Sequence, residues 1–484
     1  QYPQDHAGGP VVTVLATEHR SMSSVDRRNL FGALLVFGFV AVLVSCRKAE
    51  PWEEEAFDER LSGGAQTVFT EGVGAFSQAF PTLSGWREEF HELGDQHFEA
   101  TFVAAPAPLF QGLGTIYNSN SCFNCHINDG RGKPIQQSEP MTSMLFRTSV
   151  PGSDPHGGPL AAPGFGGQLQ DKAIFGVAAE AGVQVMWEET PFVFADGDSV
   201  QLRRPVWTLV SPYTGLPAGF MLSPRVAPPV HGLGLLEQIA GSELLALEDE
   251  SDRDGDGISG HANRVFDAVT RQQTIGRFGW KAEAPNLEQQ VAGAYNEDMG
   301  ITNKVFPVES SYGQPQFDGR SDEPEVPDSI FNSVVFYVKT LAVPARRNVT
   351  DPVVRRGKVL FNAANCSGCH RTSFTTRTDM YFPEASGQKI HPYTDLLLHD
   401  MGPGLSDDRP TYSASGSEWR TPPLWGIGLT QVVNGHNNFL HDGRARSLME
   451  AILWHGGEAS RSVDFVRNLG KEDREALLAF LKSL

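Results

Sequence analysis

Two short stretches carry the residues best suited to chemistry. Residues 122–126 (CFNCH) and 366–370 (CSGCH) both read Cys-x-x-Cys-His. This spacing is the attachment signature of c-type haem, in which two thiols add across the vinyl groups of one porphyrin and the histidine binds the iron. The predicted haem-binding residues are therefore Cys122, Cys125, His126, Cys366, Cys369 and His370.

The two motifs have alternatives. A Cys-x-x-Cys pair is also found as a redox dithiol or as half of a zinc site. Two copies, each followed directly by histidine, favour haem over both. An aromatic residue and an asparagine precede each motif, at 117–118 and 361–362, which indicates a degenerate internal duplication. The sequence therefore predicts two domains with one covalent haem c each.

Composition narrows the class of partner. The chain has 484 residues and a net charge of −19, with 58 acidic against 39 basic residues. Such a surface argues against nucleic acid as a partner and against electrostatic binding to anionic lipid. Four of the five cysteines belong to the haem motifs, and the fifth is Cys46. No cysteine pair remains for a structural disulfide.

The N-terminal region resembles a bacterial export signal. Residues 30–45 form an apolar run that is short for a membrane span and typical of a signal peptide. The run ends at Cys46 in a lipobox-like pattern, which predicts cleavage and acylation there. The mature protein is then a periplasmic lipoprotein tethered to a membrane, with the outer membrane preferred. The alternatives are an uncleaved anchor helix and a start at Met22, which would leave residues 1–21 untranslated.

These features predict a mainly α fold with two cytochrome c-like haem domains and loop-rich, short β insertions. The alternation of Val, Trp and Phe with polar residues predicts β-hairpins within 183–220. The predicted parts are a signal peptide (1–45), a lipidated tether (46–70), an N-terminal haem c domain with an insertion (71–235), a linking segment (236–345) and a C-terminal cytochrome c domain (346–484).

The linking segment contains a calcium-like loop. Asp252, Asp254 and Asp256 stand at alternate positions, with glycine at the sixth position of the repeat. Three carboxylates at this spacing converge on a hard cation, and Ile258 adds a backbone carbonyl. The twelfth position is Asn263 rather than the usual glutamate. The sequence predicts Ca²⁺ here, with an Asx-rich turn as the alternative.

Several stretches outside the two pentapeptides share a wider pattern. They are SCFNCHINDGRGKP, GFGGQLQDKAI, SPRVAPPVHGLGLLEQI, DRDGDGISGHANRV, GRFGWKAEAPNLEQQVAGAYNEDMGIT, DLLLHDMGPGLSD, RTPPLWGIGLT and FLHDGRARSLMEAILWHGGEA. These stretches resemble the family called "di-haem oxidoreductase, putative peroxidase", also labelled predicted thiol oxidoreductase. The likeness covers nearly all of residues 75–484. It extends distantly to bacterial di-haem cytochrome c peroxidases.

The resemblance implies roles around the first haem. In the relatives this haem meets peroxide, a Trp lies between the haems, and a Gln and a Glu follow the Trp on the distal side. The Trp position falls at Phe165 here, which is a departure. Gln168, Gln170 and Glu180 become the predicted catalytic residues, since a distal polar group assists proton transfer. Candidates for a sixth ligand of this haem are His156, Met141 and Met144.

For the second haem, the resemblance implies a ligand at the end of the helix predicted over 447–455. The relatives' peroxidases carry Met there, whereas this chain carries His455, the predicted sixth iron ligand. A His ligand lowers the haem potential relative to Met. The alternatives are His399, Met401 and His441.

Function follows as an expectation. The sequence predicts an exported di-haem c-type oxidoreductase, peroxidase-like. A small redox protein or a quinol-linked donor supplies electrons at one haem, and peroxide or another small oxidant reacts at the other. The alternative is a di-haem electron-transfer protein with no substrate site. A thiol oxidoreductase is disfavoured, because both Cys pairs precede His.

Overall fold

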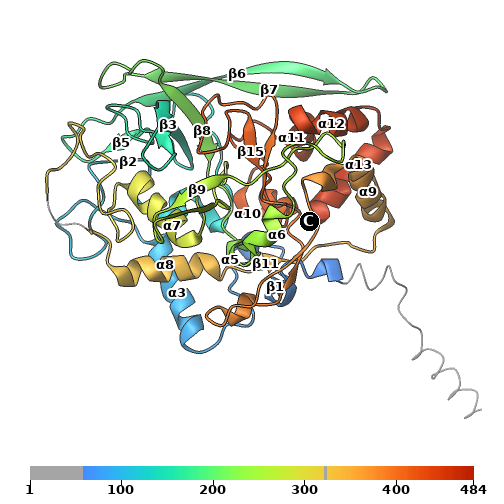
Figure 1. Cartoon of the computed structure of the whole chain (residues 1–484), viewed down its shortest axis with the longest axis horizontal. Coiled ribbons are helices and arrows are strands. Elements are labelled where there is room, and N and C mark those ends of the chain that lie inside the picture. Colours follow the sequence, from blue (N-terminus) through green and yellow to red (C-terminus); the bar gives the residue numbers. More distant parts are fainter. Residues whose placement is uncertain (1–57, 321–323) are drawn as a thin grey trace, which may run out of the picture. The chain divides into compact units, whose positions relative to one another are not determined.

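The computed structural model describes residues 58–320 and 324–484 (Figure 1). The predicted signal peptide (1–45), the predicted acylation site Cys46 and residues 46–57 of the predicted tether (46–70) lie outside these residues. Within the described ranges, the helices fall short of the length and apolarity that a membrane span requires.

The first haem motif lies on a single helical turn. Elements up to this point are η1 (Gly64–Gln66), β1 (Thr67–Val68), η2 (Val73–Ala75), α3 (Trp86–Glu99), β2 (Ile116–Tyr117), α4 (Cys122–Cys125) and η3 (Ile127–Asp129), where η marks 3-10 turns. α3 packs so closely on α8 (Asp328–Lys339) that a Cβ at Gly94 would lie 2.2 Å from the Ser333 carbonyl oxygen. His91 and His97 of α3 bond to the hydroxyls of Thr340 and Ser333.

Antiparallel strands follow the first motif. They are β3 (Met144–Ser153), β4 (Pro159–Leu160), β5 (Lys172–Ala173), β6 (Gly182–Val193), β7 (Ser199–Val210) and β8 (Met221–Val226). β4, β3 and β8 form one sheet in that order, and β5 pairs with β2. β6 and β7 form a long hairpin whose register runs from the Gly182–Val210 pair to the Val193–Ser199 pair (Figure 1). The hairpin lies in the segment where the alternating pattern predicts strands.

The middle segment consists of short elements. They are α5 (Leu233–Glu237), α6 (Gly241–Leu245), β9 (Arg264–Asp267), β10 (Gln272–Ile275), α7 (Leu287–Gly293), the π-helical turn η4 (Ala294–Asp298), α8 and β11 (Val343–Pro344). The Asn286 side chain caps α7 by accepting a hydrogen bond from the Gln289 amide. β11 pairs in parallel with β1, so this segment returns to the start of the described chain.

The second haem motif follows α9 (Pro352–Ala363), which Asp351 caps. Later elements are η5 (Cys366–Gly368), β12 (Phe374–Thr375), η6 (Pro383–Ala385), β13 (Lys389–Ile390), β14 (Leu398–Asp400), β15 (Glu418–Arg420), η7 (Ile427–Leu429), α10 (Thr430–Asn434), α11 (Leu448–Leu453), η8 (Gly457–Ala459), α12 (Ser460–Arg467) and α13 (Lys471–Ser483). α9 crosses α13 in close contact, because a Cβ at Gly357 would lie 2.0 Å from the Ala476 carbonyl oxygen.

The prediction of a mainly α fold is wrong. Helices make up 29% of the structure and strands 19%, spread over many small sheets. The two strands of the inserted hairpin are each 12 residues long. Several helices are only four to six residues long, α4, α5 and α11 among them. The fold is mixed because most of the chain between helices forms sheets and wrapping loops.

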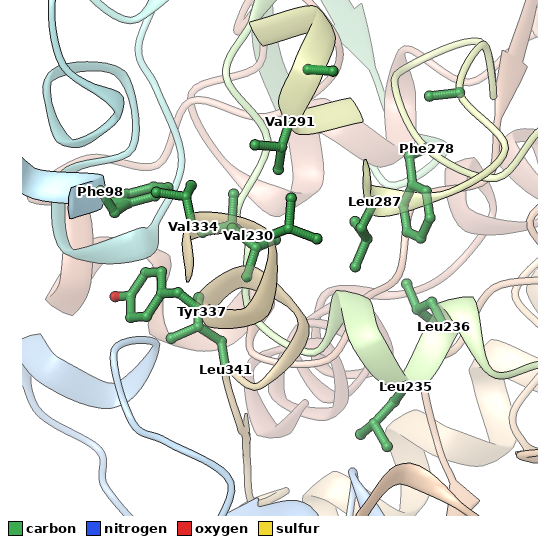
Figure 2. Close-up of a cluster of buried hydrophobic side chains, with 14 of the residues drawn as sticks. Phe98, Val230, Leu235, Leu236, Phe278, Leu287, Val291, Val334, Tyr337 and Leu341 are labelled. Carbon is green, nitrogen blue, oxygen red and sulfur yellow. The ribbon is translucent and has the colours of Figure 1, made fainter. Parts of the chain in front are cut away.

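One buried apolar cluster joins elements far apart in sequence (Figure 2). α7 contributes Leu287 and Val291, α5 contributes Leu235, and α8 contributes Val334 and Tyr337. Full burial of one such side chain contributes about 1.5–3 kcal/mol relative to its exposure. This cluster fixes α7 and α8 beside the first haem motif.

A buried ion pair joins the middle and C-terminal segments. Lys281 Nζ lies 2.9 Å from Asp407 Oδ1, and both side chains are almost fully buried. The same ammonium donates to the carbonyls of Arg409, Ser415 and Gly416. Burial lowers the pKa of Lys281 to about 8, partly opposed by Asp407.

Replacing Lys281 therefore tests how much the fold depends on this pair. Lys281→Met leaves the Asp407 carboxylate buried without its cation, which should cost about 3–5 kcal/mol of stability. Unfolding of the haem-loaded protein by denaturant measures the change. Arg253→Met is the control, because its ion pair with Asp249 is exposed and should contribute at most about 1 kcal/mol. Equal losses in the two variants would contradict the assignment.

Candidate functional site

Both Cys-x-x-Cys-His motifs open onto one cavity of about 600 Å³. Its wall is mostly apolar. All six predicted haem-binding residues line it: Cys122, Cys125, His126, Cys366, Cys369 and His370. A cavity with an apolar wall, two thiol pairs and two histidines has the donor set and the surroundings that two covalent haems require.

The first motif is fixed by its own helical turn. The His126 amide donates to the Cys122 carbonyl at 3.0 Å, which places the histidine directly after the two thiols. Burial lowers the pKa of His126 to about 4, partly opposed by the Pro228 carbonyl. The His126 imidazole is therefore neutral, the form that binds iron. Burial also raises the pKa of the Cys122 and Cys125 thiols to about 12.

The second motif has the same chemistry and a better-defined tautomer. His370 Nδ1 donates to the Tyr393 carbonyl oxygen at 2.9 Å, which leaves Nε2 for a metal. Burial lowers the pKa of His370 to about 4, and the nearby His455 lowers it further. The Phe361 ring lies 6.3 Å from the His370 ring and closes one side of the motif.

His455, the predicted sixth ligand, lies on the same cavity wall. Its Nδ1 donates to the Ala451 carbonyl oxygen at 2.7 Å, so Nε2 carries no proton and is free. Burial lowers its pKa, which keeps the ring neutral. His370 and His455 thus share one arrangement, in which a backbone carbonyl holds Nδ1 and leaves Nε2 for iron.

The two alternative histidines for this ligand, His399 and His441, have different contacts from those of His455. His399 bonds to Asp395 through Nε2 at 2.9 Å and to Glu458 through Nδ1 at 2.8 Å. Burial opposes its charge, but the neighbouring carboxylates raise the pKa of His399 well above its ordinary value. A doubly protonated ring has no lone pair for iron. The His441 ring stacks on Trp419 at 3.7 Å.

His399 and His441 line the cavity, as do two other candidates, Met401 and Met144. His156 and Met141 lie outside the cavity wall, with the His156 ring stacked on Phe266 at 3.8 Å. The position of the relatives' Trp, Phe165, is buried against Tyr213 and Phe220 instead.

The three predicted catalytic residues lie behind the wall of the cavity rather than in it. Gln168 donates to Asp298 Oδ1 at 2.7 Å, and Gln170 donates to the Glu297 carbonyl at 2.6 Å. Glu180 accepts a hydrogen bond from the Gln170 amide at 2.7 Å. These side chains hold the backbone of η4 in place. Their catalytic role stays a prediction.

The sequence reasoning missed the polar groups of η4 that line the cavity on the side of the first motif. Tyr295, Glu297 and Asp298 all do so. Burial raises the pKa of Asp298 to about 6, and Glu297 pairs with Arg147 at 3.6 Å. Their signal was the pair of consecutive acidic residues, Glu297 and Asp298, that ends the helical segment formed by α7 and η4.

A buried tryptophan lies in the wall between the two motifs. Trp280 Nε1 donates to the Val226 carbonyl at 2.8 Å, and its own carbonyl accepts from the Arg420 amide at 2.9 Å. The Arg131 guanidinium lies 5.1 Å from the centre of its ring. The sequence reasoning missed this residue as well, because it looked for the tryptophan at position 165.

The predicted calcium loop lies beside the second motif. Asp252, Asp254 and Asp256 each offer a carboxylate oxygen within 4.8 Å of the others. Asp256 also accepts a 3.3 Å hydrogen bond from Asn365, directly before the motif. The residue at the twelfth position, Asn263, is buried and bonds elsewhere, to the carbonyls of Lys281 and Thr411.

Comparison with known proteins identifies the family. Residues 57–484 match the family model described as "Di-haem oxidoreductase, putative peroxidase". The chain belongs to this family. The family name implies two haems and an oxidoreductase activity of the peroxidase type, in agreement with the two motifs at the cavity.

Other comparisons add little. No curated protein matches the chain. One solved structure, described as "Crystal structure of a MauG-like protein associated with microbial copper homeostasis", is 16% identical and covers 53% of this chain and 89% of its own. Its TM-score of 0.26 is too low for an argument about the fold.

The buried Glu180 carboxyl group should make the stability of the folded protein depend on pH. Burial raises its pKa from 4.5 to about 8 in the folded chain. A carboxyl group with a raised folded-state pKa contributes stability below pH 4.5 and loses it as the pH rises towards 8. Glu180→Gln keeps the hydrogen-bond acceptor and removes the charge.

The variant should therefore gain thermal stability relative to the wild type between pH 5 and pH 8, as followed by the melting temperature. Glu475→Gln, at an exposed position of α13, is the matched control and should follow the wild type. A Glu180→Gln curve parallel to that of the wild type would contradict the burial argument.

Proposed function

We propose that the chain is an exported c-type di-haem oxidoreductase that reduces hydrogen peroxide with electrons from a small redox protein or a quinol-linked donor. One observation carries the proposal, namely that both motifs and the free Nε2 of His455 face one cavity. When bound, the two haems supply the electron transfer. The balanced reaction consumes one peroxide, two electrons and two protons, and forms two waters.

The protein's own residues would divide the work between two unequal sites. His370 and His455 would both hold the iron of the second haem, and that haem would supply electron transfer. His126 would hold the iron of the first haem. Asp298 lies near that motif, and burial raises its pKa to about 6, so it would hold a proton that the reaction consumes, since a proton donor must lie within reach of the reacting oxygen.

Covalent attachment is part of the proposal. The thiols of each motif would form thioethers with one porphyrin, as the Cys-x-x-Cys-His spacing indicates. Under denaturing conditions the mass of the protein would then include two haems. A haem-free mass after denaturation would rule out covalent c-type attachment. That result would still be compatible with two haems bound non-covalently in the folded protein.

The proposed location is the periplasm, with the protein tethered through acylated Cys46 to a membrane, most simply the outer membrane. The apolar run at 30–45 and the lipobox-like pattern before Cys46 support this location. Fractionation of cells that produce the full chain tests it, and recovery of the protein in the cytoplasmic fraction would contradict it.

Peroxide turnover tests the proposed function. The half-reduced and fully reduced protein should oxidise a reduced small cytochrome catalytically when peroxide is added, followed by visible absorbance. Asp298→Asn keeps the size of the side chain and removes its acid–base function. We expect a loss of kcat/KM of roughly 10²–10⁴-fold, the usual contribution of general acid–base catalysis.

The control is Glu189→Gln, on the exposed face of the β6–β7 hairpin, which should leave the rate unchanged. Two low-spin haems that do not react with peroxide in any redox state would favour the alternative, an electron carrier with no substrate site.

Calcium binding by the loop at 252–258 is also proposed. The oxygens of Asp252, Asp254 and Asp256 are close enough to converge on one cation, and their loop contacts the second motif. Calcium at 100 times its Kd should stabilise the fold by about 2.7 kcal/mol relative to chelator-treated protein. Asp254→Asn should reduce this gain in thermal unfolding. The control Asp464→Asn, on α12, should keep it, and equal gains in both variants would contradict the site.

A further inference from the structure

Arginines are the main polar groups of the cavity wall. Five of them line it, at positions 131, 147, 225, 409 and 420. Two have carboxylate partners on the same wall: Arg225 lies 2.5 Å from Glu283, and Arg147 lies 3.6 Å from Glu297. These two ion pairs account for both glutamates of the wall.

The other three, Arg131, Arg409 and Arg420, form no ion pair with any residue in the described part of the chain. Among the described residues, each guanidinium hydrogen-bonds only to neutral groups. The Nε of Arg131 donates to the Asn438 carbonyl at 2.7 Å, and a second nitrogen donates to the Leu440 carbonyl.

Arg409 and Arg420 show the same pattern. Arg409 donates to the Thr411 hydroxyl at 3.0 Å and to the Thr148 carbonyl at 3.2 Å. Arg420 donates to the Gly279 carbonyl at 2.8 Å and to the Thr421 carbonyl at 3.1 Å. Each guanidinium has five N–H donors, so these bonds leave several donors of each group for another ligand.

Burial of these three positive charges destabilises the folded state. Arg409 is 4% exposed and Arg420 is 8% exposed. Burial lowers the pKa of Arg131 and of Arg420 to about 10 and that of Arg409 to about 9. A buried cation destabilises a fold unless an anion and hydrogen bonds compensate for it. All three line the cavity, so an anion bound there could reach each of them.

Two of the three, Arg131 and Arg420, contact the same wall residue, Trp280. Arg131 comes five residues after His126 and stacks on Trp280, whose carbonyl accepts from the Arg420 amide. Arg420 pairs with Leu398 in the β14–β15 ladder, next to the second motif. A ligand held by this pair of arginines would therefore touch both haem sites.

We propose that Arg131, Arg409 and Arg420 bind the propionate carboxylates of the two haems. Each haem carries two propionates, so the cavity would receive four carboxylates for three guanidinium groups that form no ion pair with the described residues. Arginine suits this role, because its planar fork binds a carboxylate through two parallel hydrogen bonds. This inference depends on one part of the proposed function, namely that both haems bind in this cavity.

Redox titration of the di-haem protein tests the pairing. A guanidinium beside a haem stabilises the reduced, less positive iron, so its removal should lower the reduction potential of that haem. We expect Arg409→Met and Arg420→Met each to lower the potential of at least one haem. Arg277→Met is the matched control, since Arg277 is equally buried and pairs with no carboxylate but lies outside the cavity wall.

The outcomes separate this inference from the proposed function. Denaturing mass spectrometry of each variant reports covalent attachment, and peroxide turnover reports the reaction, so neither depends on the potentials. Potentials equal to those of the wild type and of the control in both variants would overturn the pairing. If the methionine variants do not fold, a crystal structure of the wild-type haem protein decides: propionate oxygens within about 3 Å of these arginines support the proposal, and propionates directed away from all three overturn it.

Discussion

The structure depends on one mostly apolar cavity to which both halves of the chain contribute. The cavity has a volume of about 600 Å³ and a mostly apolar wall, which suits a large apolar group such as a porphyrin. The two Cys-x-x-Cys-His motifs place thiols and imidazoles on its wall. Two haems would thus serve as the centre of the core, and the helices and loops around them would pack on porphyrin as well as on each other.

Hydrogen bonds prepare this cavity for iron before any chemistry occurs. Backbone carbonyls hold Nδ1 of His370 and of His455, which fixes each tautomer and presents Nε2. His399 instead lies between the carboxylates of Asp395 and Glu458, and its ring forms an ion pair with them. The difference between a ligand and a structural cation is therefore set by the partner of each ring nitrogen.

The local parts of the site could be predicted from the sequence, and the long-range parts could not. A motif of five residues fixes its own geometry, so the motifs and the ligand candidate His455 followed from spacing and resemblance. The η4 residues Tyr295 and Glu297 come to the cavity only through packing of α7 on α8, about 170 residues after the first motif. The β6–β7 hairpin lies where the alternating pattern predicts strands, but the mainly α prediction failed because several helices are only four to six residues long and further strands, such as β3 and β8, pair outside that segment.

The most direct test of the shared cavity is pulsed EPR of the fully oxidised protein, in which both haems are paramagnetic. Two haems in one cavity should show magnetic dipolar coupling, with faster electron-spin relaxation at each haem than in variants that lack the other motif (Cys122→Ser with Cys125→Ser, or Cys366→Ser with Cys369→Ser). A wild-type signal equal to the sum of the two single-motif signals would contradict the account.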